Sequence, residues 1–397
     1  MKSGKLFDKK KLKKKALEPL VTFRQVKQHM AYFCYPTMGN YFNDENWEWH
    51  WRPSLMVCFM FICMVLIGID CYLNRHDWMH LVFATTLIPY AIMGFERVLL
   101  VNNVRKPFFA MYITMERYIE KWEQDPEIFP IFQWYCRVAK WIVYGCSVSF
   151  IGGGFLFVTV SVLIYYVVTG KMEVVIPIYI PNMDYNSHPG FEIHVVAHTY
   201  LAFLAETGYS VFINSMIVVL IMACAEADVI IQKEEKLHGM LEKNSKDKKI
   251  EKLLKEIYEL HQDLLKLVDN IEHMWSIQQL TDHIIFGAQI ILILYIVLQQ
   301  FWLPGYLMIA AAMFIIFAID LLGTLVEVKL DKLSIATYDV SWYLLSVKNQ
   351  KDYNYFLQAT QKTARLTLRS GPPLNLDTFV RFCKGIYSYL MVLRETT

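Results

Sequence analysis

The chain has 397 residues, of which 55% are hydrophobic, 15% aromatic and only 19% charged, with a formal net charge of +2. Soluble proteins carry roughly 25% charged residues, so this composition argues against soluble domains and indicates a membrane protein. The small net charge gives no support to a nucleic-acid partner, and the spacing of the cysteines suggests neither a zinc site nor a disulfide framework.

Seven apolar stretches are long enough to cross, as helices, a bilayer core of about 30 Å. They cover residues 54–73, 78–101, 138–168, 195–224, 276–299, 302–326 and 374–394, and the last of them is the least apolar. The sequence therefore predicts an all-α, polytopic membrane protein with seven transmembrane helices.

Lysine and arginine are distributed unevenly among the connections between these stretches. They concentrate in residues 1–53, 225–275 and 327–373, whereas the alternate connections hold little more than Arg75 and Lys171. Because cytoplasmic segments carry the excess of basic residues, this pattern predicts a cytosolic N-terminus and an extracellular C-terminus. This orientation is opposite to that of G-protein-coupled receptors.

Residues 1–53 are expected to form a cytosolic tail followed by an interfacial segment. The basic run from Lys9 to Lys15 would be attracted to anionic lipid of the inner leaflet. Aromatic residues, among them Trp47, Trp49 and Trp51, are dense between positions 28 and 52, as is typical of a membrane interface. We expect this segment to lie along the inner leaflet.

The segments 225–275 and 327–373 each contain an amphipathic stretch, and together they predict a helical anchor domain beneath the membrane. Apolar residues that recur at spacings of three and four define an apolar seam, which runs directly into the fifth span. The seam consists of Ile250, Leu253, Ile257, Leu260, Leu264, Leu267, Ile271 and Met274. It could serve packing within the chain or assembly of subunits, and we favour assembly.

Sequence motifs for enzymatic chemistry are absent. His194 and His198 have the spacing of metal ligands on a helix, but no third ligand of clear geometry accompanies them. The sequence has no glycine-rich phosphate loop, nucleophile elbow or His-Glu zinc motif. We therefore expect neither enzymatic activity nor a cofactor.

The last span carries a polar stripe, in which residues recur at steps of three and four. The stripe and its continuation toward the outer end comprise Asp377, Arg381, Lys384, Ser388, Val392 and Glu395. Charges are costly in lipid, so this stripe faces either a water-filled pore or a polar interior of the chain itself, as in transporters. In a pore, Val392 would form a hydrophobic gate that closes by dewetting, and several subunits would be needed to enclose it.

Four segments of the C-terminal third carry a family resemblance. They are Tyr338–Tyr343, Gln358–Leu368, Leu376–Phe379 and Tyr387–Leu393. Through them the chain resembles the insect odorant receptor family, and its length and inverted seven-span plan extend the resemblance across the first two thirds in layout only. Gustatory receptors end with a Thr-Tyr motif followed by Gln-Phe, whereas this chain has Ser388-Tyr389 and then Leu393-Arg394.

The resemblance implies an odorant-gated, non-selective cation channel, a tetramer around the last span, in the plasma membrane of olfactory sensory neurons. The family contains a co-receptor, which is longer between the fourth and fifth spans, and odorant-tuning receptors. The short 225–275 connection resembles that of a tuning subunit, which forms a heterotetramer with the co-receptor. In this comparison Val392 matches the gate and Glu395 the outer mouth, while Arg381 and Lys384 would repel permeant cations unless partner subunits offset them or they face elsewhere.

Two alternatives are a gustatory-receptor-like ligand-gated channel and a membrane transporter. A transporter predicts broken spans at matching places in two repeats. The run Gly152-Gly153-Gly154 is the only candidate break, and it has no counterpart in the sequence.

In this family the ligand pocket lies in the outer half of the bundle, among the second, third, fourth and sixth spans. The corresponding residues here are Phe83, Leu87, Tyr90, Phe150, Gly154, Phe157, His198, Ala202, Phe203, Trp302, Tyr306 and Ile309. Such a pocket suits a small volatile organic ligand, and its aromatic rings favour a ring-containing one. Ordinary bundle packing is the alternative for each residue. For Glu206, at mid-depth of the fourth span, we favour a tie between helices over a place at the pocket floor.

Overall fold

The computed structural model describes residues 18–396 except 87, 171, 173–179, 181–182, 185, 244–246, 300–301 and 363–364. The described part is built from helices, and its only β-type pairing is an isolated bridge between Thr367 and Pro373. The predicted all-α class is therefore confirmed.

The helices follow one another along the chain as α2 (Pro19–Met38), α3 (Trp51–Leu73), α4 (Trp78–Thr85), α5 (Ile88–Trp122), α6 (Phe129–Phe155), the π-helix η1 (Leu156–Val160), α7 (Ser161–Thr169), α8 (Gly190–Glu242), α9 (Asp247–Gln299), α10 (Leu303–Asp339), the 3₁₀-helix η2 (Trp342–Leu344), α11 (Val347–Gln361) and α12 (Leu376–Thr396). All seven predicted spans fall on helices. The second is divided between α4 and α5, and the third continues from α6 through η1 into α7 without a break at the glycine run.

Among the described residues, five helical segments are long and apolar enough to cross a membrane. They are Trp51–Leu73, Phe129–Val168, Gly190–Glu242, Lys248–Gln299 and Gly305–Asp339. The predicted spans 78–101 and 374–394 are helical but are not among these five. In α12 the reason is visible in the sequence, because Asp377, Arg381, Lys384 and Arg394 lower its hydropathy.

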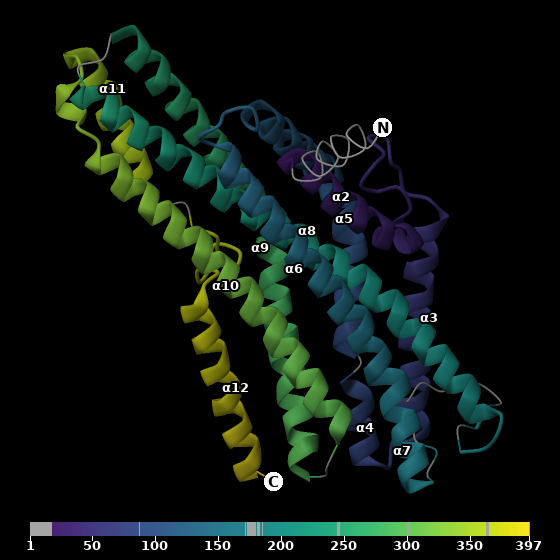
Figure 1. Cartoon of the computed structure of the whole chain (residues 1–397). Coiled ribbons are helices and arrows are strands. Elements are labelled where there is room, and N and C mark those ends of the chain that lie inside the picture. The colour runs from purple at the N-terminus through teal and green to yellow at the C-terminus, as the bar shows by residue number, and fades with distance from the viewer. Residues whose placement is uncertain are drawn as a thin grey trace, which may run out of the picture.

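The helices α8 and α9 are much longer than a bilayer requires. Each has 53 residues, and a rise of 1.5 Å per residue makes such a helix about 80 Å long. One end of the molecule is a helical region formed by four helices: the C-terminal part of α8, the N-terminal part of α9, the C-terminal part of α10, and α11 (Figure 1). We call it the anchor region (residues 225–275 and 327–373). The C-terminus of α12 lies at the opposite end, which we call the distal end.

The core is centred on α8, which packs against α2, α6, α9 and α10. Every residue from Ile213 to Ala227 is buried. Most residues of this stretch are apolar, which suits a position where every face meets another helix. This stretch is the structural centre around which the other helices are arranged.

The apolar seam of α9 is buried along its whole length. All eight seam residues, from Ile250 to Met274, are at most 7% exposed, and α9 packs against α8 and α10 of the same chain. Packing within the chain therefore accounts for the seam. The assembly role that the sequence analysis favoured is not needed to explain it.

The aromatic residues before the first span divide into two sets. Tyr41, Phe42 and Trp47 are buried in the main core, and the Trp47 Nε1–H donates a hydrogen bond of 2.7 Å to the Met38 carbonyl. Trp49 and Trp51 are exposed. The first set thus builds the fold, and the interfacial location stays a prediction for the exposed set.

Candidate ligand cavity and pore-lining helix

The apolar face of α12 attaches this helix to α9 and α10. The ring of Phe379 lies 5.4 Å from that of Phe317 on α10, and the ring of Phe382 lies 5.6 Å from that of His283 on α9. A Cβ atom added at Gly287 of α9 would lie 3.1 Å from the Phe382 ring. The two helices therefore approach closely because α9 has a glycine at their crossing.

The opposite face of α12 carries the predicted polar stripe, and all six of its residues are exposed in the single chain. The Val392 side chain is 59% exposed. Figure 1 shows α12 at the edge of the bundle, where it packs mainly against α9 and α10. The stripe thus does not face a polar interior of its own chain, which removes that alternative for this structure.

Two of the stripe charges neutralise each other. Arg381 forms an ion pair with Asp377 one turn earlier on α12, and the Ser388 hydroxyl donates a hydrogen bond of 2.9 Å to the Lys384 carbonyl. The Arg381 charge, which would otherwise repel cations, is therefore offset within the helix itself.

A cavity of about 700 Å³ lies between α6, η1 and α8. Ile151, Gly154 and Phe155 line it from one side, and Val195 and Phe203 from the other. The π-helix η1 directly follows the glycine run and contributes Thr159, and π-helical segments within α-helices often occur at functional sites.

The cavity opens to the surface of the bundle. Its lining residues Phe155, Val196, Tyr200 and Phe203 are 44–69% exposed. A second cavity of about 460 Å³ lies on the other side of Phe203 and is lined by residues of α2, the loop after it and α8. The Phe203 side chain therefore lines both cavities, and the second one is more polar, because Gln28, Asn40 and Asn43 line it.

Of the predicted pocket residues, Gly154 and Phe203 line the larger cavity. His198 is buried outside its lining, and the Phe150 ring packs 5.5 Å from that of Tyr209. The side chains of Phe83 and Phe157, and all of Leu87, fall outside the described residues.

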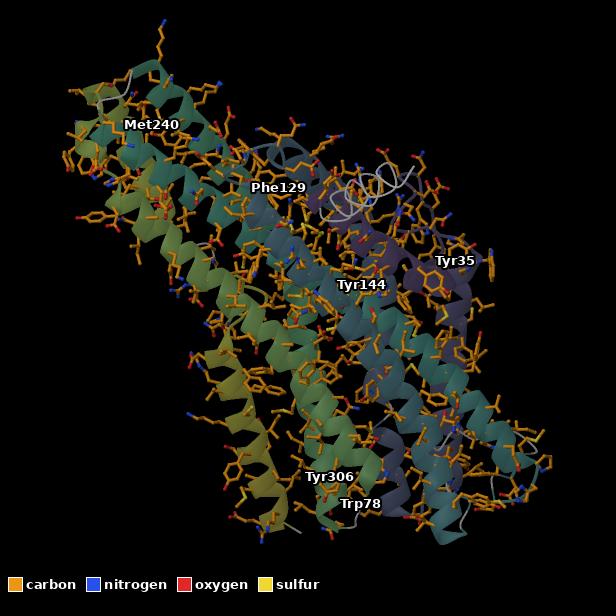
Figure 2. The ribbon with its side chains drawn as sticks, viewed as in Figure 1. Tyr35, Trp78, Phe129, Tyr144, Met240 and Tyr306 are labelled. Carbon is orange, nitrogen blue, oxygen red and sulfur yellow. The ribbon has the colours of Figure 1, made fainter. Side chains whose placement is uncertain are left out.

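The remaining predicted pocket residues do not line the cavity. Tyr90 and Tyr306 are 40% and 45% exposed, and Ala202, Trp302 and Ile309 are partly buried. Figure 2 shows Tyr306 near Trp78 at the distal end, far from Met240 at the anchor end. The cavity is thus lined by two of the predicted pocket residues, Gly154 and Phe203, and also by Glu206. For Glu206 the sequence analysis had favoured a tie between helices.

A buried charge network connects α8 to α5 and α9. The Arg97 guanidinium lies 4.2 Å from the centre of the Tyr209 ring. Its Nη2 atom donates hydrogen bonds of 2.9 Å to both carboxylate oxygens of Asp282, and its Nη1 donates one of 3.1 Å to the Met93 carbonyl. Charged groups within membrane spans are rare and mark functional sites by default.

The network continues to the attachment of α12. Next to Asp282 in the chain, the His283 Nε2 atom lies 3.2 Å from the Asp320 carboxylate of α10, and the same histidine ring contacts Phe382. Tyr209 lies one turn from the cavity residue Glu206 on α8. Side-chain contacts, together with neighbouring positions on α8 and α9, therefore connect the cavity wall to the helix that carries the polar stripe.

Comparison with known proteins identifies the family of the chain. The family model described as 7tm Odorant receptor matches residues 112–387. The chain belongs to this odorant receptor family. It is therefore a multi-pass membrane receptor and, as predicted, not an enzyme.

Solved structures agree with this odorant receptor assignment in fold. The structure of the insect olfactory receptor OR5 from Machilis hrabei in complex with eugenol covers 95% of this chain and 100% of its own, with a TM-score of 0.79 and 14% sequence identity. The structure of OR5 alone covers 87% of this chain and 88% of its own, with a TM-score of 0.70 and 12% identity. At these identities the likeness establishes the fold of this receptor.

Proposed function

We propose that this odorant receptor is a tuning subunit that assembles with the co-receptor into an odorant-gated, non-selective cation channel. The observation that carries the proposal is the exposed polar stripe of α12. A lysine, arginine or aspartate at the centre of a membrane helix costs roughly 2.5–3.5 kcal/mol when the alternative is water. A single chain would direct these side chains into lipid, whereas an oligomer around α12 surrounds them with water.

In this arrangement the α12 helices of four subunits enclose a central pore. Val392 supplies an apolar constriction toward the distal end, which excludes water when narrow. Glu395 lies one turn further, where a carboxylate attracts cations to the mouth. The distal end is then extracellular and the anchor region cytosolic, in agreement with the basic residues of the anchor region.

The tuning assignment rests on the connection between α8 and α9. Helix α8 ends at Glu242 and α9 begins at Asp247, so residues 243–246 alone connect the two long helices. The co-receptor of the family resembled here is longer at this connection. The plasma membrane of olfactory sensory neurons is the location that follows from this role.

We further propose that the odorant binds in the cavity between α6, η1 and α8, with Phe203 and Gly154 in its wall. A pocket of 300–1,000 Å³ is the usual size for a small organic ligand. OR5 of Machilis hrabei is known in complex with eugenol, and a ring-containing molecule of similar size suits the aromatic side chains here. Binding would shift α8 and, through Tyr209, Arg97 and Asp282, the attachment of α12.

The proposal is tested by expressing the chain with and without the co-receptor and recording currents against an odorant panel. We expect odorant-evoked cation currents from the pair, with a ligand profile that the co-receptor alone lacks. Surface expression of both subunits without any current that depends on this chain would refute the channel role.

A further inference from the structure

The cavity contains an ionisable group whose carboxyl oxygens have no partner among the residues that the structure describes. Glu206 lines the cavity, and no hydrogen bond or ion pair of the described residues involves its carboxyl group. Carboxylates within membrane spans pair with another group in almost all cases. An unpaired one in a ligand-sized cavity therefore indicates a partner that arrives with the ligand.

The neighbouring helix is shaped to leave room for this side chain. A Cβ atom added at Gly154 would lie 2.8 Å from the Glu206 Cγ and 3.4 Å from its Cδ. Since any larger residue would collide with Glu206, the glycine lets the carboxyl lie against α6 at the edge of the cavity. The position of the acid thus depends on a specific small residue across the cavity.

The threonine hydroxyls of the lining are already committed. The Thr159 and Thr199 Oγ1 atoms are 2.7 Å apart, and the Thr199 hydroxyl donates a hydrogen bond of 2.7 Å to the Val195 carbonyl. The Thr159 hydroxyl can then donate to Thr199, so both donors are used. Tyr200 lies at the rim, 60% exposed. The threonines thus keep only hydroxyl acceptor lone pairs, and Glu206 is the one carboxyl group among the lining residues. A hydrogen bond to an ionised carboxylate is stronger than one to a neutral hydroxyl.

From these contacts we infer that Glu206 determines ligand class: the cavity binds compact apolar molecules that carry one hydrogen-bond donor, an alcohol, a phenol or an amine, placed against the carboxyl group. The inference rests on the proposed function, because it takes this cavity as the odorant site. The Glu206 carboxyl would select ligands by their hydrogen-bond donor and not by the presence of a ring. An apolar analogue without the donor would leave the carboxyl without a partner when water is displaced, and such a loss weakens binding.

The test uses matched probes that differ only in the donor: eugenol and its methyl ether, and 2-phenylethanol and its methyl ether. Ligand-induced thermal stabilisation of the purified complex with the co-receptor in lipid nanodiscs measures binding without channel activity. We expect the donor-bearing member of at least one pair to bind about tenfold to hundredfold more tightly, as for a hydrogen bond to a charged group. Glu206→Leu should abolish this preference, while the binding of the ethers stays within about threefold.

Glu192→Gln is the matched control on the same helix, because Glu192 is exposed and pairs with His188 outside the cavity. It should leave the preference unchanged. Equal binding of alcohols and ethers to the parent protein, or a preference that survives Glu206→Leu, would overturn the inference. If Glu206→Leu lowers the midpoint of the ligand-free protein and weakens both members of a pair alike, Glu206 is a tie between helices and the inference is wrong.

Currents recorded from the same variants test the ligand class and the channel role separately. Odorant-evoked currents that show no dependence on a donor group would contradict the ligand class and leave the channel role intact. If neither the donor-bearing nor the donor-free odorants evoke a current from the complex, the channel proposal itself is contradicted.

Discussion

The two halves of α8 differ in how they are packed. From Ile213 to Ala227, every residue is buried by surrounding helices. In the preceding turns, Val196, Tyr200 and Phe203 are 69%, 60% and 44% exposed, and a cavity lies beside them. One helix thus passes from a dense core into a loosely packed region. Regions with few buried contacts open at lower free energy than the core, so ligand response belongs to the distal half.

The charged residues of α8 also differ between its two halves, the anchor half toward Glu242 and the distal half toward Gly190. In the anchor half, the Lys233 Nζ atom lies 2.7 Å from the Glu256 carboxylate, 3.2 Å from that of Asp125 and 4.4 Å from the centre of the Trp122 ring. In the distal half, Glu206 has no such partner within the described part of the chain. The charges around Lys233 are thus paired, which disfavours rearrangement at that place. In the distal half, we propose that the Glu206 carboxyl pairs with the ligand.

The largest expected effect comes from charges placed in the dense half. Leu260→Asp combined with Leu264→Asp puts two carboxylates at positions that are 2% and 0% exposed. Each unpaired buried charge costs several kcal/mol, which exceeds the margin of a typical fold. We expect the double variant to be lost from the folded peak in size-exclusion chromatography. Gln262→Asp with Lys266→Asp, at exposed positions of the same helix, should behave like the parent; equal behaviour of the two double variants would remove the distinction between the halves.

The second prediction concerns the boundary between the halves. Asp282→Asn leaves the buried Arg97 guanidinium with a neutral partner, so we expect a loss of about 3–5 kcal/mol in stability and a lower thermal midpoint. Replacing both members, Arg97→Met with Asp282→Leu, removes the uncompensated charge and should restore most of the midpoint. If the restored variant also recovers normal odorant sensitivity, Arg97 and Asp282 stabilise the bundle without coupling the cavity to α12.

A smaller effect is expected in the loose half. Phe203→Ala removes an aromatic wall of the cavity without touching the dense core, so surface expression should remain normal. The odorant concentration for half-maximal current should rise about tenfold, which corresponds to the loss of roughly 1.4 kcal/mol of apolar contact. Phe314→Ala is a suitable control, because Phe314 is 62% exposed on α10 and does not line the cavity.

The smallest effect is expected at the distal end of α12. Glu395→Gln removes one carboxylate per tuning subunit from the proposed mouth, while the co-receptor keeps its own residues. Divalent cations should be attracted less, with little change for monovalent cations, because the interaction scales with charge. Reversal potentials in calcium-rich and sodium-rich solutions measure this preference, and identical values for variant and parent would place Glu395 away from the conduction path.

The elements that sequence reasoning predicted well are those whose signal is local. The spacing of three and four from Ile250 to Met274 identified a buried seam, and the same spacing in α12 identified a face that the structure leaves exposed. Both patterns depend only on the geometry of a single helix. For the seam, however, periodicity shows that a partner exists and not which chain supplies it.

Features that depend on contacts between distant segments could not be predicted in this way. Arg97 and Asp282 are separated by 185 positions, and nothing in either local sequence pairs them. The cavity depends on how α6, η1 and α8 pack against one another, which no periodicity encodes. A usable signal did exist for Glu206, because a carboxyl in a span and a glycine run in the neighbouring span are both visible in the sequence.

The central claim is that the exposed face of α12 lines a pore, and cysteine accessibility at Val392 tests it most directly. In complexes with the co-receptor, Val392→Cys should react with a membrane-impermeant thiol reagent from outside and lose odorant-evoked current, since the added group lies in the conduction path. Two controls should keep their odorant-evoked current after the same treatment. They are Leu390→Cys, on the partly buried side of the same turn, and the parent protein with its native Cys383. Persistence of full current after complete modification at Val392 would contradict the account, because the stripe would then lie outside the pore.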